Sequence, residues 1–174
     1  MNHKHCAAKC YANKAYRAYP STKTAWNKNF ELAKTDLDGV EAQLTAYLKK
    51  YKKTLFRIHV SGDFFSQAYL DMWKRIAETY PAIRFLAYTK VYWLDYSDKP
   101  NNLEIVLSTF ETMPNALDVI EKLSKKYNLP IAHAGQEMPE IENMEFIDCP
   151  WDCETCQACW FLSETKSNVF FKYH

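Results

Sequence analysis

The chain has 174 residues, of which 48% are hydrophobic and 25% charged; these proportions fit one globular domain and exclude a disordered, collagenous or coiled-coil chain. No apolar run approaches the roughly 20 residues that cross a bilayer, and the first residues lack the apolar stretch of a signal peptide, so we expect a cytoplasmic protein without membrane contact. The net charge of +1 makes nucleic acid an unexpected partner, and the three glycines leave no P-loop or dinucleotide-binding fingerprint.

The first predicted elements follow an irregular start. Asp38 and the apolar spacing after it predict a helix over residues 38–52. A short β-rich run over residues 55–60 comes next. Ser66 then caps a second helix whose apolar positions continue to Tyr80. Together these residues predict a helix followed by a strand, a loop and another helix.

The same pattern recurs further along the chain. Apolar runs at residues 83–88 and 104–107 precede a predicted helix between Pro114 and Tyr127, and a run at residues 129–132 follows it. Strands that alternate with helices predict right-handed βαβ crossovers. We therefore expect an α/β fold with a partial βα barrel or an open, mostly parallel sheet, because the chain is too short for a complete TIM barrel.

Small polar and charged residues follow the predicted strands. In parallel α/β proteins the loops at the carboxyl ends of the strands form the ligand-binding edge. The candidate rim residues are Ser61, Gly62, Asp63, Thr89, Lys90 and His133. His59, by contrast, falls inside a predicted strand, and we expect it to be a core residue with satisfied ring nitrogens.

Four of the six cysteines lie close together near the C-terminus. Cys149, Cys153, Cys156 and Cys159 form C-x3-C-x2-C-x2-C, and the repeated two-residue spacing is typical of iron–sulfur ligation. Four thiolates also suit a structural zinc ion. The spacing favours a cluster, above all [4Fe-4S], over zinc and over unliganded cysteines.

The other two cysteines, Cys6 and Cys10, form C-x3-C near the N-terminus and cannot complete a four-thiolate site alone. Residues 1–35 hold seven Lys and Arg and one acidic residue, whereas residues 131–165 hold eight acidic residues and no Lys or Arg. This charge pattern indicates either two solvated faces of opposite sign or two segments that meet. We expect one domain over residues 1–174 whose cysteine-bearing ends share one site, with free buried thiols as the alternative for Cys6 and Cys10.

Four ordered motifs resemble the gene-product-eighty-eight family of phage proteins. They are Cys10-Tyr11-Ala12, Ser61-Gly62-Asp63-Phe64, Tyr88-Thr89-Lys90 and the closing stretch from Cys153 to Trp160. The resemblance implies a phage-encoded protein that works in the cytoplasm of the host cell.

More distantly, the layout is similar to the radical S-adenosylmethionine enzymes. Cys6 and Cys10 match the first two cysteines of their C-x3-C-x2-C loop, Asn13 occupies the third position, and Asp63 falls where an acidic motif holds the methionine amino group. The resemblance implies that Asp63 binds an ammonium group, although capping the following helix is an equal alternative. Because those enzymes need three thiolates and an open iron, Asn13 favours a closed cluster completed by C-terminal cysteines.

These observations predict an iron–sulfur protein that acts in electron transfer or redox sensing with an unidentified redox partner or small molecule. Two alternatives stay open: a minimal radical enzyme, which alone would bind S-adenosylmethionine, and a zinc-stabilised binding module. The sequence leaves open whether the protein is an enzyme.

Overall fold

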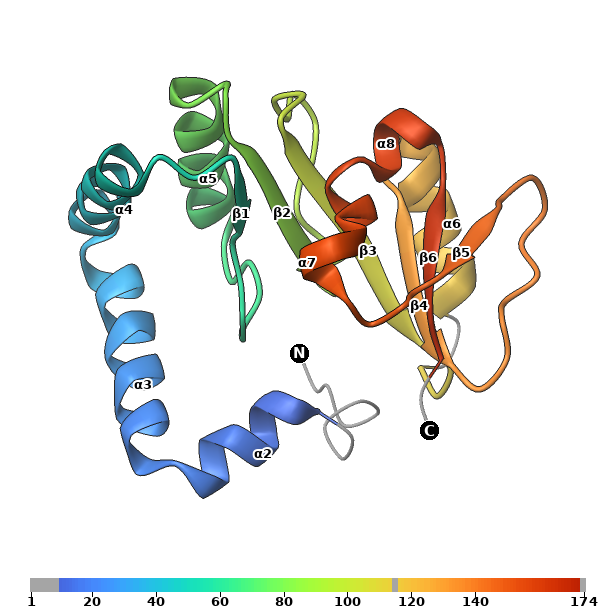
Figure 1. Ribbon diagram of the computed structural model, residues 1–174, viewed down its shortest axis with the longest axis horizontal. Coiled ribbons are helices and arrows are strands. Elements are labelled where there is room, and N and C mark those ends of the chain that lie inside the picture. Colours follow the sequence, from blue (N-terminus) through green and yellow to red (C-terminus); the bar gives the residue numbers. More distant parts are fainter. Residues whose placement is uncertain (1–9, 114–115, 173–174) are drawn as a thin grey trace.

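The computed structural model describes residues 10–113 and 116–172 and contains an open, six-stranded sheet in which all paired strands are parallel. The strand order is β1-β2-β3-β4-β6-β5 (Figure 1). The strands are β1 (Leu55–Arg57), β2 (Arg84–Thr89), β3 (Leu103–Phe110), β4 (Ile131–Gly135), β5 (Phe146–Asp148) and β6 (Asn168–Lys172). The predicted α/β class with a mostly parallel sheet is confirmed in its open form.

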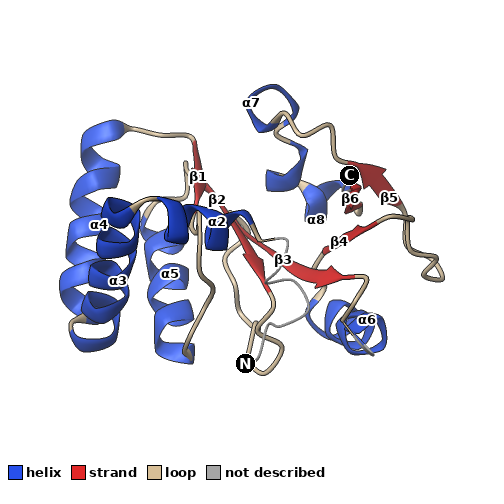
Figure 2. Ribbon diagram, turned by 90° about the horizontal axis from the view of Figure 1, so that it is seen from below, coloured by secondary structure: helices blue, strands red, loops and turns tan. Residues whose placement is uncertain are grey.

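Helices lie on both faces of this sheet. The helices of the described chain are α2 (Tyr11–Ala18), α3 (Pro20–Thr35), α4 (Leu37–Tyr51), α5 (Gln67–Thr79), α6 (Ala116–Tyr127), α7 (Cys153–Cys156), the 3-10 helix η1 (Ala158–Trp160) and α8 (Leu162–Thr165). Figure 2 shows α5 and α6 on one face and α7 and α8 on the other. None of the helices in the described residues is long and apolar enough to cross a membrane.

The side on which α7 and α8 lie follows from the order of the strands. From β1 to β4 each strand pairs with the next in the sequence, whereas the step from β5 to β6 runs backwards, because β6 pairs between β4 and β5. A right-handed crossover that reverses its direction must pass over the opposite face of the sheet. The cysteine-bearing connection between β5 and β6 is therefore separated from α5 and α6 by the sheet.

Each face of the sheet has its own apolar core. Side chains such as Ile105 and Leu107 pack under α5 and α6, whereas Val106 and Ala132 pack against Trp160 and Leu162 on the other face. Neighbouring residues of one strand point to opposite faces, so a sheet covered on both sides needs apolar residues at consecutive positions. The continuous apolar runs in the sequence have this origin.

The N-terminal region differs from the prediction. Residues before 38 were expected to be irregular, but α2 and α3 occupy most of them. Helix α3 buries no side chain, so it lacks the wide apolar face that marks a helix packed on a core. The start of α4 also differs, because its N-cap is Asp36, whose carboxylate accepts a hydrogen bond from Gly39 N at 2.9 Å.

Candidate metal centre at the C-terminal thiols

The four C-terminal cysteines line a single pocket. Cys149 follows β5, and its N–H donates to Phe170 O of β6 at 2.8 Å. Cys153 and Cys156 begin and end α7, and Cys159 lies in η1. Gln157, with a φ of 51°, turns the chain between these two helices. The short elements after β5 therefore bring four of the six predicted ligands, the C-terminal ones, to the lining of one pocket.

An apolar cluster anchors one side of this pocket. Trp160 and Leu162 pack on the sheet, and Cys149 and Cys159 are half-buried against the same cluster. Cys153 and Cys156 are exposed. Two sulfurs thus face the protein and two face solvent.

The half-buried thiols have raised pKa values. Burial raises the pKa of Cys159 to about 11; the other three cysteines add to this rise, and a hydrogen bond from Tyr88 opposes it. Burial also raises the pKa of Cys149, although Trp151 N donates a hydrogen bond to its Sγ at 3.4 Å. Both thiols are therefore protonated at neutral pH, and a metal bound here would displace protons.

The donor set fits a soft metal centre, because four free thiols line the pocket and an amide and a hydroxyl donate to two of them. Among the residues that the structure describes, however, no three Cys, His, Asp or Glu side chains lie close enough to hold one metal ion. Four sulfurs around one zinc ion, each about 2.3 Å from the metal, must lie within about 4 Å of one another. In the described chain the four thiols therefore line one pocket but do not form a ready-made site for a single ion.

The N-terminal cysteines are not part of this pocket in the described chain. Cys10 is half-buried at the N-cap of α2 and is not among the lining residues. Cys6 lies outside the described residues. Figures 1 and 2 show α2 beneath the carboxyl ends of the strands. A site shared by the two cysteine-bearing ends stays a prediction.

The rim candidates Ser61, Gly62 and Asp63 follow β1, and Asp63 connects this loop to the end of β2. Its Oδ1 accepts from Thr89 Oγ1 at 2.7 Å and from Phe64 N at 2.8 Å, and its Oδ2 accepts from Lys90 N at 2.7 Å. Burial raises the pKa of Asp63, and these hydrogen bonds lower it. The Asp63 carboxylate therefore joins the loop after β1 to the end of β2 by hydrogen bonds, and we call this connection the clamp.

The side chain of Lys90 is also held within the protein. Its Nζ donates to Ser108 Oγ at 2.9 Å. Ser108 belongs to β3, which extends beyond the predicted run of residues 104–107. Lys90 thus connects the ends of two neighbouring strands.

His59 was predicted inside a strand and His133 in a loop, and the structure reverses these two places. β1 ends at Arg57, so His59 lies in the loop, whereas His133 is inside β4, which extends past the predicted run of residues 129–132. Neither ring nitrogen of His59 has a hydrogen-bond partner among the described residues, so the expectation of satisfied nitrogens is wrong. Burial, followed by the charge of Arg57, lowers the pKa of His59 to about 4.

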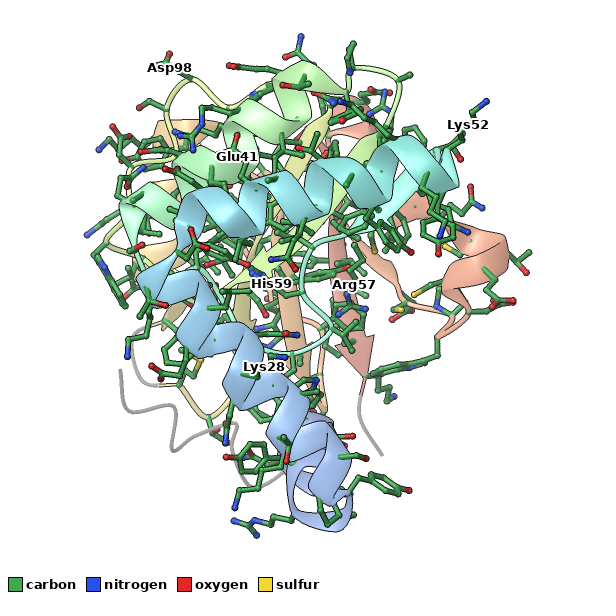
Figure 3. All side chains as sticks on the ribbon, turned by 90° about the vertical axis from the view of Figure 1, so that its left-hand side faces the viewer. Lys28, Glu41, Lys52, Arg57, His59 and Asp98 are labelled. Atoms are coloured by element: carbon green, nitrogen blue, oxygen red, sulfur yellow. The ribbon has the colours of Figure 1, made fainter. Side chains whose placement is uncertain are left out.

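His59 lines a cavity of about 540 Å³ that the sequence did not predict. The cavity lies between α2, α3 and the loop after β1. In Figure 3 His59 lies in the space between α4 above and α3 below. The aromatic rings around it include Tyr16, Phe65 and Tyr69. The helices α2 and α3, which form one wall of this cavity, were not expected. The only signal for that wall in the sequence is the aromatic content of residues 10–35.

Comparison with known proteins gives a consistent family. Residues 1–162 match the family described as "Gene product 88". The "Gene 88 protein" of Mycobacterium phage L5 is 28% identical over 186 residues, and that of Mycobacterium phage D29 is 27% identical over 191 residues. Each alignment covers 95% of this chain and 78% of the phage protein. No solved structure matches the chain.

Proposed function

This chain belongs to the Gene product 88 family, and we propose that it is an iron–sulfur protein that acts in electron transfer or redox sensing. The observation that carries the proposal is the pocket lined by Cys149, Cys153, Cys156 and Cys159, all free thiols. Soft thiolates are the ligands that iron–sulfur clusters use, and four of them complete a [4Fe-4S] centre.

The chain's own residues suit such a centre. The hydroxyl of Tyr88 and the amide of Trp151 donate to Cys159 and Cys149, and such hydrogen bonds to ligand sulfurs orient the ligands and tune the reduction potential. Trp160 keeps water from the side that packs on the sheet. A cluster bound there would take up and release an electron. The exposed side, at Cys153 and Cys156, is where a redox partner would approach.

Four C-terminal thiols favour a closed cluster over a radical enzyme. A closed centre needs neither Cys6 nor Cys10 and leaves no iron open to S-adenosylmethionine. Asp63, the residue that would hold the ammonium group of that molecule, accepts three hydrogen bonds from the chain itself. These hydrogen bonds explain the position of the Asp63 carboxylate without a bound ligand.

The test is the metal content of the full chain purified without oxygen. We expect a brown protein with iron, acid-labile sulfide and broad absorption near ~400 nm. Cys156→Ser and Cys159→Ser should lose most of the iron, whereas Cys10→Ser and Asp63→Asn should keep it. A colourless protein with stoichiometric zinc, even after reconstitution with iron and sulfide, would refute the proposal in favour of a zinc-stabilised module.

A second measurement separates the electron carrier from the radical enzyme. S-adenosylmethionine added to the reduced protein should leave the paramagnetic resonance spectrum of the cluster unchanged and should not be cleaved. A shifted spectrum together with 5′-deoxyadenosine would overturn the closed cluster and make the protein an enzyme.

A further inference from the structure

A separate cavity of about 440 Å³ opens at the carboxyl ends of β3 and β4, beside the start of α6. We call it the β3–β4 pocket. Open parallel sheets bind ligands in crevices outside the carboxyl ends of their strands. The pocket lies at that edge of the sheet.

Two neighbouring buried polar side chains lie at this edge of the sheet: His133, which lines the pocket, and Thr109, which is beside it but is not a lining residue. Thr109 and His133 are register partners on β3 and β4 and are 1% and 4% exposed. Thr109 Oγ1 and His133 Nδ1 have no hydrogen-bond partner among the described residues. A buried polar atom without a partner costs about 1–3 kcal/mol, so such atoms in a cavity indicate a place for a polar ligand or for water.

Gly135 allows two further groups to converge. A Cβ at this position would lie 3.0 Å from His133 Nε2 and 3.1 Å from Glu111 Oε2. The same Glu111 oxygen accepts from Gln136 N at 2.7 Å, which fixes the carboxylate. The ring nitrogen and the carboxylate thus lie beside one another, and no hydrogen bond joins them. A hydrogen-bond donor placed between them would serve both.

The charge of the pocket indicates the kind of donor. Burial lowers the pKa of His133, so the ring is neutral and offers a lone pair. Among the residues that the structure describes, the lining includes three carboxylates, those of Glu111, Asp118 and Glu137, and no Lys or Arg. Its remaining walls are largely apolar and include Phe110, Met113, Leu117 and Met138. A pocket with carboxylates at its bottom and apolar side walls fits a cation carried on a short hydrocarbon chain.

We propose that the β3–β4 pocket binds a small primary amine, whose ammonium group lies between Glu111 and His133 and whose chain contacts Met113 and Met138. The site is independent of the cysteine pocket, which lies on the other face of the sheet. Loss of the metal centre and loss of amine binding are therefore separate outcomes.

Methyl NMR of the full chain with ¹³C-labelled methionine tests this proposal, because Met113 and Met138 line the pocket whereas Met72 is in the core. The probe is n-butylammonium chloride, and 1-butanol is the uncharged control. We expect saturable shifts of the two pocket methyls with a Kd in about the millimolar range, as befits a ligand with few atoms. Butanol should bind at least ~10-fold more weakly, because it lacks the charge.

Glu111→Gln keeps the acceptor for Gln136 N and removes the charge, so the Kd for the amine should rise about 10-fold or more. Glu78→Gln, an exposed change on α5, is the matched control and should leave the Kd unchanged. Gly135→Ala keeps every charge but occupies the point where the two groups converge, and it should also weaken binding. The unchanged Met72 resonance shows that each variant is folded.

Three results would overturn the proposal. Equal shifts with butanol would mean an apolar cavity without cation selectivity. Full binding by Glu111→Gln would remove the assigned anchor. The absence of any saturable shift of Met113 and Met138 in the wild type would show that the pocket takes no amine.

Discussion

His59 makes the stability of the protein depend on pH in a way that one substitution can isolate. Its pKa falls from 6.5 to about 4 on folding, chiefly because the ring is buried and secondly because of Arg57. The folded-state pKa is below the unfolded one, so the contribution of His59 is complete above pH 6.5 and is lost as the pH falls towards 4. At about 1.4 kcal/mol for each pKa unit, the full loss is about 3 kcal/mol, of which about 2 kcal/mol has occurred by about pH 5.

The substitution His59→Phe removes the titration and keeps an aromatic ring against Phe64 and Tyr69, whose centroids lie 5.0 and 5.8 Å from that of His59. No described hydrogen bond is lost, because neither ring nitrogen has a partner. We therefore expect the variant to be at least as stable as the wild type at about pH 7.5. At about pH 5 its free energy of unfolding should exceed that of the wild type by about 2 kcal/mol more than at about pH 7.5.

Urea unfolding of the reduced protein at these two pH values measures the difference. His133→Gln is the control, because it should retain the part of the pH dependence that belongs to His59. If His59→Phe and the wild type lost the same free energy of unfolding between the two pH values, the buried, neutral state of His59 would be refuted.

Two further predictions concern the clamp at the rim and the support of the thiol pocket. Asp63→Asn removes the charge that accepts three hydrogen bonds and should cost about 1–3 kcal/mol in urea unfolding; the exposed Asp98→Asn should cost little, and equal costs would refute the clamp. Leu162→Ala empties a fully buried position under the cysteine segment and should cost about 2–5 kcal/mol. It should also speed the reaction of Cys159 with a thiol reagent, and an unchanged rate would show that the segment does not depend on this anchor.

The sequence predicted the elements whose signals are local. The helix expected at residues 38–52 is α4, and the apolar spacing that indicated it follows from its packed face. The helix capped by Ser66 is α5, and Ser66 Oγ accepts from Tyr69 N at 3.2 Å. Both predictions needed only neighbours in the chain.

Local signals were absent where the prediction failed. Helix α3 has no buried side chain, and its spaced apolar residues Trp26, Phe30 and Ala33 line a cavity rather than the core. β6 was not predicted, and its place between β4 and β5 depends on pairing with strands that come earlier in the chain. The β1 strand was predicted too long, because an apolar run cannot show where its ladder partner on β2 ends.

By itself the sequence determined that Cys149, Cys153, Cys156 and Cys159 lie in one region of the protein, because their short spacing keeps them within one segment whatever surrounds it; they line one pocket. The tertiary structure alone decided that this segment crosses the face of the sheet opposite α6, since that depends on the strand order. It also decided that Asp63 is bound to the end of β2 and that the ring nitrogens of His59 are buried without a hydrogen-bond partner in the described chain. These outcomes rest on contacts between residues distant in the chain, which no local pattern encodes.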